Sequence, residues 1–321
     1  MAFPVYELAT AGFGACIGSF LNVVIHRLPQ EDPAKRSLGG RSHCPVCHKQ
    51  IAWHDNIPVF GWMLLRGRSR CCKQRISFRY PLVELLTAAM FVLLALRASS
   101  HGPLLLSGVM EPAFLWPFVF DAAFVSFLIA SSFIDWDHRI LPDALNFPFM
   151  IAGCTLVAFV SPGHAGTLTD GAISPELDSI VTSSFGLAVG WGSCYAVHFF
   201  GGKLFKQDAM GLGDVKFLAA IGAFLGWQGA LWTFFLGCIL GAVGGVLQQA
   251  FTRDSKIPFG PFLALGAVLV MFFEPALREF VFHTWPEWQR TSPLALPIVG
   301  GASLVSLLAL VLVVRRGRRN G

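Results

Sequence analysis

Two stretches decide how this chain folds: SSFIDWDHRILPD at residues 131–143 and MGLGDVKFLAAIG at residues 210–222. In each stretch an acidic residue, Asp135 or Asp214, stands where an apolar helix meets a short polar link. A carboxylate near the bilayer core is costly unless it is neutralised, paired or hydrated, so an acid there marks a functional site. The two stretches therefore predict membrane-embedded acid chemistry.

The composition predicts an all-α polytopic membrane protein. Of the 321 residues, 54% are hydrophobic and 13% are charged, which leaves too little polar surface for an ordinary soluble globule. Apolar windows of about 17 to 25 residues predict about nine transmembrane helices, of which the sixth is short. These helices are expected at residues Pro4–Ile25, Leu82–Ala98, Ala113–Ile134, Leu141–Val160, Ile180–Phe200, Val215–Gly226, Ala230–Phe251, Phe259–Phe282 and Leu294–Val314.

Positive charge predicts how the helices are oriented. The link from Arg27 to Arg79 carries eleven Lys and Arg residues against three acids, and Lys and Arg near membrane spans are retained on the cytoplasmic side. With nine helices the N-terminus faces out and the basic C-terminal tail faces in. The first helix lacks a basic n-region and a cleavage pattern, so we expect it to be retained. Its Gly12, Gly14 and Gly18 predict the close approach of another helix.

Four regions are expected from these patterns. They are the first transmembrane helix at 1–26, a cytoplasmic Cys-bearing insert at 27–80, a transmembrane core with the acids at 81–282, and an extra C-terminal helix with a basic tail at 283–321.

The insert carries two close pairs of cysteines, Cys44 with Cys47 and Cys71 with Cys72. Disulfides are disfavoured in the reducing cytoplasm, and four thiols in two pairs suit a closed, structural zinc site. Adjacent cysteines cannot both bind zinc from one ordinary knuckle without an altered backbone. Two alternatives therefore stay open: a basic cap with unliganded thiols, or three cysteines joined by one histidine from among His43, His48 and His54.

The two acids are expected to meet although they are far apart in sequence. The third helix runs inward and ends before Asp135, and the sixth begins beside Asp214, so both lie at the cytoplasmic face. Paired carboxylates a few ångströms apart share one proton. One then takes a proton from water attacking a peptide carbonyl, and the other protonates the departing group. Gly211 and Gly213 allow irregular backbone and close approach of an extended peptide.

Other polar residues are candidates for supporting roles. Lys216 can bias the charge of the neighbouring acid or anchor its helix at the interface, and Asp143 either supports the site or belongs to a solvated turn. Glu84 lies near the inner face and can assist the site or pair with a cation. Asp121 lies fourteen residues before Asp135, which is roughly 21 Å along a helix, so it cannot join the same pair.

An ordered series of motifs runs from about Gly18 to Ala264 and resembles the type IV prepilin peptidases, a family of GxGD intramembrane aspartic proteases. A lone GxGD would be weak, whereas the whole series is specific. The motifs are GSFLNVVIHRLP at 18–29, CPVC at 44–47, NIP at 56–58, RYPLVEL at 79–85, ID at 134–135 with LPD at 141–143, GLGDVK at 211–216 and PFGPF at 258–262.

The resemblance implies a multi-pass enzyme of the bacterial inner membrane whose catalytic aspartates are Asp135 and Asp214. Such an enzyme removes the basic leader of type IV prepilins or type II secretion pseudopilins at the cytoplasmic membrane face. Many members also N-methylate the new N-terminus with S-adenosylmethionine, and the cysteine-bearing domain is implicated in that step. The expected partners are these substrates and the lipid bilayer, with no nucleic acid.

The chain departs from the family pattern in two places. The family's second cysteine pair is usually C-x2-C, and its first member would fall on Ser69, which leaves Cys72 in register and Cys71 displaced. The ninth helix, Leu294–Val314, lies beyond the usual eight.

Two other classes of function are alternatives. A proton- or cation-coupled transporter also uses intramembrane acids, but it favours acids spread through the bilayer and internal repeats. A noncatalytic assembly protein, docking partners through its zinc module, should tolerate Asp135→Asn and Asp214→Asn.

Overall fold

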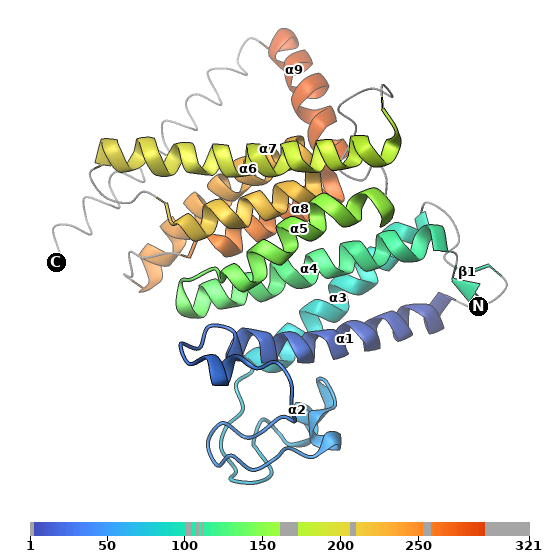
Figure 1. The fold of residues 1–321 in the computed structure, drawn as a ribbon, viewed down its shortest axis with the longest axis vertical. Helices are drawn as coiled ribbons and strands as arrows, with labels where there is room; N and C mark the ends of the chain where they lie inside the picture. The colour runs from blue at the N-terminus through green and yellow to red at the C-terminus, as the bar shows by residue number, and fades with distance from the viewer. Residues whose placement is uncertain are drawn as a thin grey trace.

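The computed structural model describes residues 3–100, 105–106, 109–110, 112–160, 173–205, 210–252 and 258–292. These residues form a helical bundle with a small module beside α1 and α3 (Figure 1). Six helices are long and apolar enough to cross a membrane, so the prediction of a helical polytopic membrane protein is confirmed. The expected ninth helix, Leu294–Val314, lies outside the described residues.

The bundle helices begin and end close to the limits expected from the apolar runs. They are α1 (Phe3–Arg27), α3 (Arg79–Ser100), α4 (Pro112–His138), α5 (Asp143–Val160), α6 (Pro175–Phe205), α7 (Leu212–Thr252) and α8 (Gly260–Glu279), the last continuing through a π turn, η3 (Phe280–Thr284), into α9 (Trp285–Thr291). The insert holds η1 (Pro33–Arg36), η2 (Trp53–Asn56) and α2 (Phe60–Leu64), and a two-residue hairpin of β1 (Leu105–Leu106) and β2 (Val109–Met110) precedes α4.

Helix α7 contains two arms that correspond to the expected sixth and seventh helices. Gly226 interrupts it with φ 72° and ψ 180°, a conformation open to glycine but strained for other residues. In a straight helix Gly222 and Ala230 would lie about 12 Å apart. Instead, the Ala230 Cβ lies 3.2 Å from the place that a Cβ on Gly222 would take. The chain therefore turns sharply at Gly226, and the two arms contact each other.

Polar contacts join neighbouring helix ends at one end of the bundle, on the left in Figure 1. We call this the polar end. The C-terminal ends of α1, α4 and α6 meet the N-terminal ends of α3, α5, α7 and α8 there, as expected for helices that alternate in direction. The contacts are Asn22 with Tyr80, Arg79 with Asp137, Asp135 with Gly260, Asp143 with Lys216, and His198 with Met210.

Glycines set the close approach of α1 to α3. A Cβ on Gly18 would lie 2.7 Å from the Glu84 Cα, and one on Gly14 would lie 2.9 Å from the Ala88 Cα. The predicted close approach is therefore confirmed at these two glycines. At Gly12 a Cβ would meet nothing within 4 Å among the residues that the structure describes, so no close approach is seen there.

Aromatic stacking fixes α4 against the first arm of α7. The ring of Phe224 stacks on Phe120 at 4.5 Å and on Phe124 at 4.7 Å between centroids, and Phe127 contacts Phe217 at 5.3 Å. Offset aromatic pairs at such separations stabilise beyond the area they bury. This packing holds together the two helices that carry the predicted acids.

Candidate active site and metal centre

Asp135 lies in the last turn of α4 and is buried, with 6% of its surface exposed. Its Oδ2 accepts a hydrogen bond of 2.9 Å from the backbone N–H of Gly260, the first residue of α8. A Cβ on Gly260 would lie only 2.7 Å from the same oxygen. The absence of a side chain at Gly260 therefore allows the backbone donor to reach the carboxylate.

Asp214 lies in the first turn of α7 and is half-buried. Its N–H donates to the carbonyl of Gly211 at 3.2 Å. A Cβ on Gly211 would lie 3.2 Å from the Asp214 Oδ2, and one on Gly213 would lie 3.2 Å from the Cβ of Leu141. The two glycines thus keep the space around the carboxylate free and let the α7 start approach the α4–α5 link.

The structure brings Asp135 and Asp214 together at the polar end. The charge of Asp135 acts on the carboxyl of Asp214, although one acid comes from the end of α4 and the other from the start of α7. Both acids therefore lie at the same end of the bundle and are electrostatically coupled.

Lys216 and Asp143 pair with each other. The Lys216 Nζ donates to both carboxylate oxygens of Asp143, at 2.7 and 2.9 Å. Lys216 is two residues from Asp214, and Asp143 begins α5, so the ion pair joins the start of α5 to the N-terminal part of α7. The ion pair is partly exposed, and the positive charge of Lys216 is directed at Asp143.

Glu84 is buried and connects α3 to the insert. Its Oε2 accepts a hydrogen bond of 2.7 Å from the backbone N–H of Val59, and the hydroxyl of Ser19 on α1 also hydrogen-bonds to it. These contacts make Glu84 the point at which the insert is joined to the α1–α3 pair.

Sequence reasoning missed the role of Gly260. The glycine lies in the PFGPF motif, but its contact with Asp135 joins residues 125 positions apart, which no local pattern indicates. His198, on α6, has its Nδ1 2.6 Å from the carbonyl of Met210. It thereby joins the end of α6 to the link that precedes Asp214.

The four insert cysteines converge as a possible metal site. Their Sγ atoms all lie within 4.8 Å of one another, with separations of 3.7 Å for Cys44 and Cys72, 3.2 Å for Cys47 and Cys71, and 4.0 Å for Cys71 and Cys72. Zinc bound tetrahedrally at about 2.3 Å requires sulfur atoms about 3.8 Å apart. The thiols therefore fit zinc, and within the parts of the chain that the structure describes no histidine joins the cluster.

The backbone explains how adjacent cysteines both reach the cluster. Two turns repeat the same hydrogen bonds, and in this repeat Ser69 takes the position of Cys44, while Cys72 takes that of Cys47. Cys71 lies between these positions, and the Ser69 hydroxyl is 3.1 Å from the Cys72 Sγ. The matching bonds run from Cys44 N to Lys49 O and Ser69 N to Gln74 O, and from His48 N to Cys44 O and Lys73 N to Ser69 O.

Hydrogen bonds favour the thiolate at Cys44 and Cys72, whereas at Cys47 a backbone hydrogen bond from Lys49 is outweighed by the neighbouring thiols, which raise its pKa to about 11. Backbone N–H groups of Cys47 and Val46 lower the pKa of the Cys44 thiol to about 6, and the Ser69 hydroxyl lowers the pKa of Cys72. Since the thiolate is the form that binds metal, these shifts favour coordination by Cys44 and Cys72.

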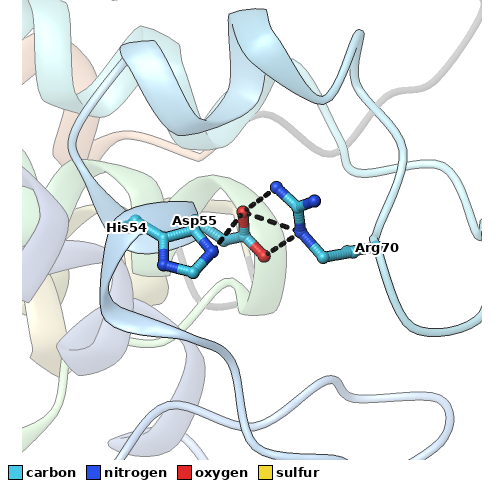
Figure 2. Close-up of polar contacts among 3 residues, drawn as sticks. All are labelled: His54, Asp55 and Arg70. Atoms are coloured by element: carbon cyan, nitrogen blue, oxygen red, sulfur yellow. Dashed lines mark hydrogen bonds and ion pairs between the residues drawn. The ribbon is translucent and has the colours of Figure 1, made fainter.

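An ion pair braces the second turn of the cluster (Figure 2). The Arg70 guanidinium donates to both oxygens of Asp55, with its shortest contact at 2.7 Å, and the His54 Nε2 lies 3.7 Å from the same carboxylate. The hydrogen bonds from Arg70 hold the pKa of Asp55 below its usual value. Because Arg70 lies between Ser69 and Cys71, the pair fastens the cysteine turn to η2.

Two known families match the chain. Residues 13–98 match the Bacterial Peptidase A24 N-terminal domain, and residues 122–246 match the Type IV leader peptidase family. These ranges contain the four cysteines, Asp135 and Asp214.

Curated relatives show the same similarity. A Prepilin leader peptidase/N-methyltransferase of Aeromonas salmonicida is 32% identical over 297 residues, covering 85% of this chain and 92% of the relative. One of the same name from Myxococcus xanthus is 36% identical over 251 residues, covering 78% of this chain and 65% of the relative. A Type 4 prepilin-like proteins leader peptide-processing enzyme of Escherichia coli O78:H11 is 34% identical over 288 residues, covering 85% and 95%. No solved structure matches.

Proposed function

Since the chain belongs to the type IV leader peptidase family, we propose that it is an intramembrane aspartic endopeptidase that removes the basic leader of type IV prepilins or type II secretion pseudopilins. The enzyme is a peptidase that also methylates, as the names of its relatives state. The observation that carries the proposed mechanism is the meeting of Asp135 and Asp214 at the polar end.

In the proposed reaction the two carboxyl groups share one proton. The unprotonated carboxylate takes a proton from a water molecule, and the water oxygen bonds to the carbonyl carbon of the scissile peptide. The second carboxyl gives its proton to the departing nitrogen as the C–N bond breaks. The products are a leader with a new carboxyl group and a pilin with a free N-terminal amine. The Gly260 N–H keeps the Asp135 carboxylate in position throughout.

The polar end is the proposed cytoplasmic face of the inner membrane, and with nine helices the N-terminus lies outside and the C-terminus inside. Support comes from the basic residues at this end, which include Arg27, Arg79 and Lys216. A prepilin leader is basic and stays inside, while the following apolar helix enters the bilayer. The bond between them then lies at the interface, level with the two acids.

The second activity concerns the amine that cleavage releases. S-Adenosylmethionine is the proposed methyl donor, and among the described residues we assign none to its binding. Zinc would have a structural role, ordering the insert at residues 27–80. Its ligands would be Cys44, Cys47, Cys71 and Cys72. The chemistry of cleavage belongs to the core, residues 81–282, and needs no metal in this scheme.

Two conservative substitutions test the acid pair. Asp135→Asn and Asp214→Asn should each lower the rate of leader removal by at least about 10³-fold, because two residues that act as one catalytic unit both lose their effect when either is removed. Asp121→Asn, on the same helix as Asp135, is the matched control and should keep its rate. Product masses from a purified enzyme and a prepilin would measure both activities. Full cleavage by both single variants would contradict the mechanism and favour a transporter or an assembly protein.

A further inference from the structure

One face of the short helix α2 exposes large apolar side chains. Phe60, Met63 and Leu64 are 64%, 59% and 77% exposed, and their i, i+3 and i+4 spacing places them on the same side of the helix. The opposite side is packed, since the Trp62 Nε1 donates to the Ile76 carbonyl at 3.1 Å. A small polar module has no folding reason to turn three large apolar side chains outward together.

Basic residues surround a hollow next to this face. The hollow has a volume of about 540 Å³ and is lined by Leu64, Leu65, Arg66, Arg68 and Lys73. All three basic side chains are exposed. Unlike the neighbouring Arg70, which binds Asp55, none of the three forms an ion pair within the described ranges. The hollow therefore offers unneutralised positive charge beside an apolar surface.

A strained turn fixes the position of α2 relative to the membrane helix α3. Val59, which precedes α2, has φ 64° and ψ −53°, and the N–H of Phe60 closes a three-residue turn onto the Pro58 carbonyl at 2.6 Å. A branched residue holds such a backbone only when its surroundings enforce it. The enforcing contact is the hydrogen bond from the Val59 N–H to Glu84.

Glu84 lies inside the membrane helix α3, five residues after its first residue, Arg79. At 1.5 Å per residue this is about 7.5 Å along the helix axis. The start of α2 is therefore held level with the second turn of a membrane-spanning helix. In a bilayer this level is the headgroup region, where interfacial helices bury an apolar face.

From this geometry we propose that α2 and the hollow beside it form an interfacial anchor for acidic phospholipid. Phe60, Met63 and Leu64 enter the boundary of the acyl chains, and Arg66, Arg68 and Lys73 bind the anionic headgroup. Charge complementarity selects this occupant, because the basic leader of the proposed substrate would be repelled by the hollow. The anchor would hold the insert against the membrane next to the helix ends that carry the two acids.

The test compares the full-length protein in lipid nanodiscs of phosphatidylcholine alone and of phosphatidylcholine mixed with phosphatidylglycerol. Hydrogen exchange of the backbone over residues 60–68 is the readout. We expect protection in the acidic nanodiscs and its loss at high salt, since surface charge is screened there. Equal protection in the two lipids would overturn the proposal.

Paired variants distinguish lipid binding at this site from a general effect of surface charge. Each basic residue near an acidic surface contributes roughly a fivefold change in affinity, so Arg66→Gln with Arg68→Gln should weaken phosphatidylglycerol binding by about 25-fold. Lys35→Gln with Arg36→Gln removes the same charge from η1 and should weaken it far less. Met63→Ser with Leu64→Ser should also reduce protection. Equal weakening by the η1 pair would overturn the proposal.

Two soluble probes distinguish lipid from other anions. Inorganic phosphate and S-adenosylmethionine are each added to the protein in phosphatidylcholine nanodiscs. Neither should protect residues 60–68. Protection by either compound would show a soluble-ligand site and overturn the assignment to lipid. Because none of these measurements uses cleavage, failure of the anchor is distinguishable from failure of the proposed protease mechanism.

Discussion

Gly260→Ala should slow leader cleavage by displacing Asp135 while keeping its hydrogen-bond donor. An added Cβ would stand 2.7 Å from the Asp135 Oδ2, whereas ordinary contact begins near 3.4 Å. The carboxylate must therefore move by about 0.7 Å, and a misplacement of about 1 Å costs about 100-fold in rate. We expect kcat for cleavage to fall about 10- to 100-fold with a smaller change in KM.

The assay follows cleavage of a prepilin by mass spectrometry and, separately, methylation of a pilin peptide that already lacks its leader. Gly260→Ala should lower the first rate and leave the second unchanged, because only the first needs the Asp135 carboxylate. Gly192→Ala on α6 is the matched control, since a Cβ there meets nothing within 4 Å. Wild-type cleavage by a folded Gly260→Ala variant would refute the reasoning. Equal loss of both activities would refute it too.

Three further substitutions probe the rest of the structure. Cys72→Ser should release bound zinc, measured by metal analysis, and should impair methylation more than cleavage; unchanged metal content would contradict a zinc site. Glu84→Gln weakens a charged hydrogen bond to Val59, so limited proteolysis of the insert should become about tenfold faster or more, and an unchanged rate would argue against this tether. Gly186→Ala places a Cβ 2.2 Å from the Gly222 carbonyl oxygen, and this overpacking should cost about 1 to 3 kcal/mol or more in thermal unfolding. An unchanged melting temperature would contradict this expectation and would mean that α6 and α7 can move apart to accommodate the added methyl group without strain.

The membrane helices could be predicted from sequence because their signal is local. An apolar run of sufficient length next to basic residues identifies a helix and its end without reference to any partner. The same local signals put Asp135 at the end of one helix and Asp214 at the start of another, and alternation of direction then brought both to one face. The Gly226 turn also lay where the apolar pattern separates two helices.

The contacts of the supporting residues could not be predicted in the same way. Lys216 is two residues from Asp214, but its ion pair is with Asp143 on another helix. Glu84 resembles an intramembrane site residue, yet the contacts of its carboxylate are with Val59 and Ser19. In each case the packing of distant segments determines the partner, so the sequence around the residue cannot predict it.

The departure at Ser69 shows how a disturbed motif retains its geometry. The sequence spacing places Ser69 where the usual C-x2-C pair has its first cysteine, and it displaces Cys71 from that position. The backbone turn around Ser69 nevertheless repeats the turn around Cys44. The thiol that the serine lacks is replaced by the neighbouring Cys71, whose Sγ reaches Cys47 at 3.2 Å. Four sulfur atoms thus converge although the spacing differs.

The position of the insert has a consequence for the order of the two proposed reactions. Arg79 at the start of α3 forms an ion pair with Asp137, which lies two residues after Asp135. Five residues further along α3, Glu84 holds the insert through Val59. The insert is therefore joined to α3, and the start of α3 is joined to the end of α4, which carries Asp135. If methyl transfer takes place at the insert, as the family resemblance implies, cleavage would release the new amine close to it, and the substrate's apolar helix could remain in the bilayer between the two reactions.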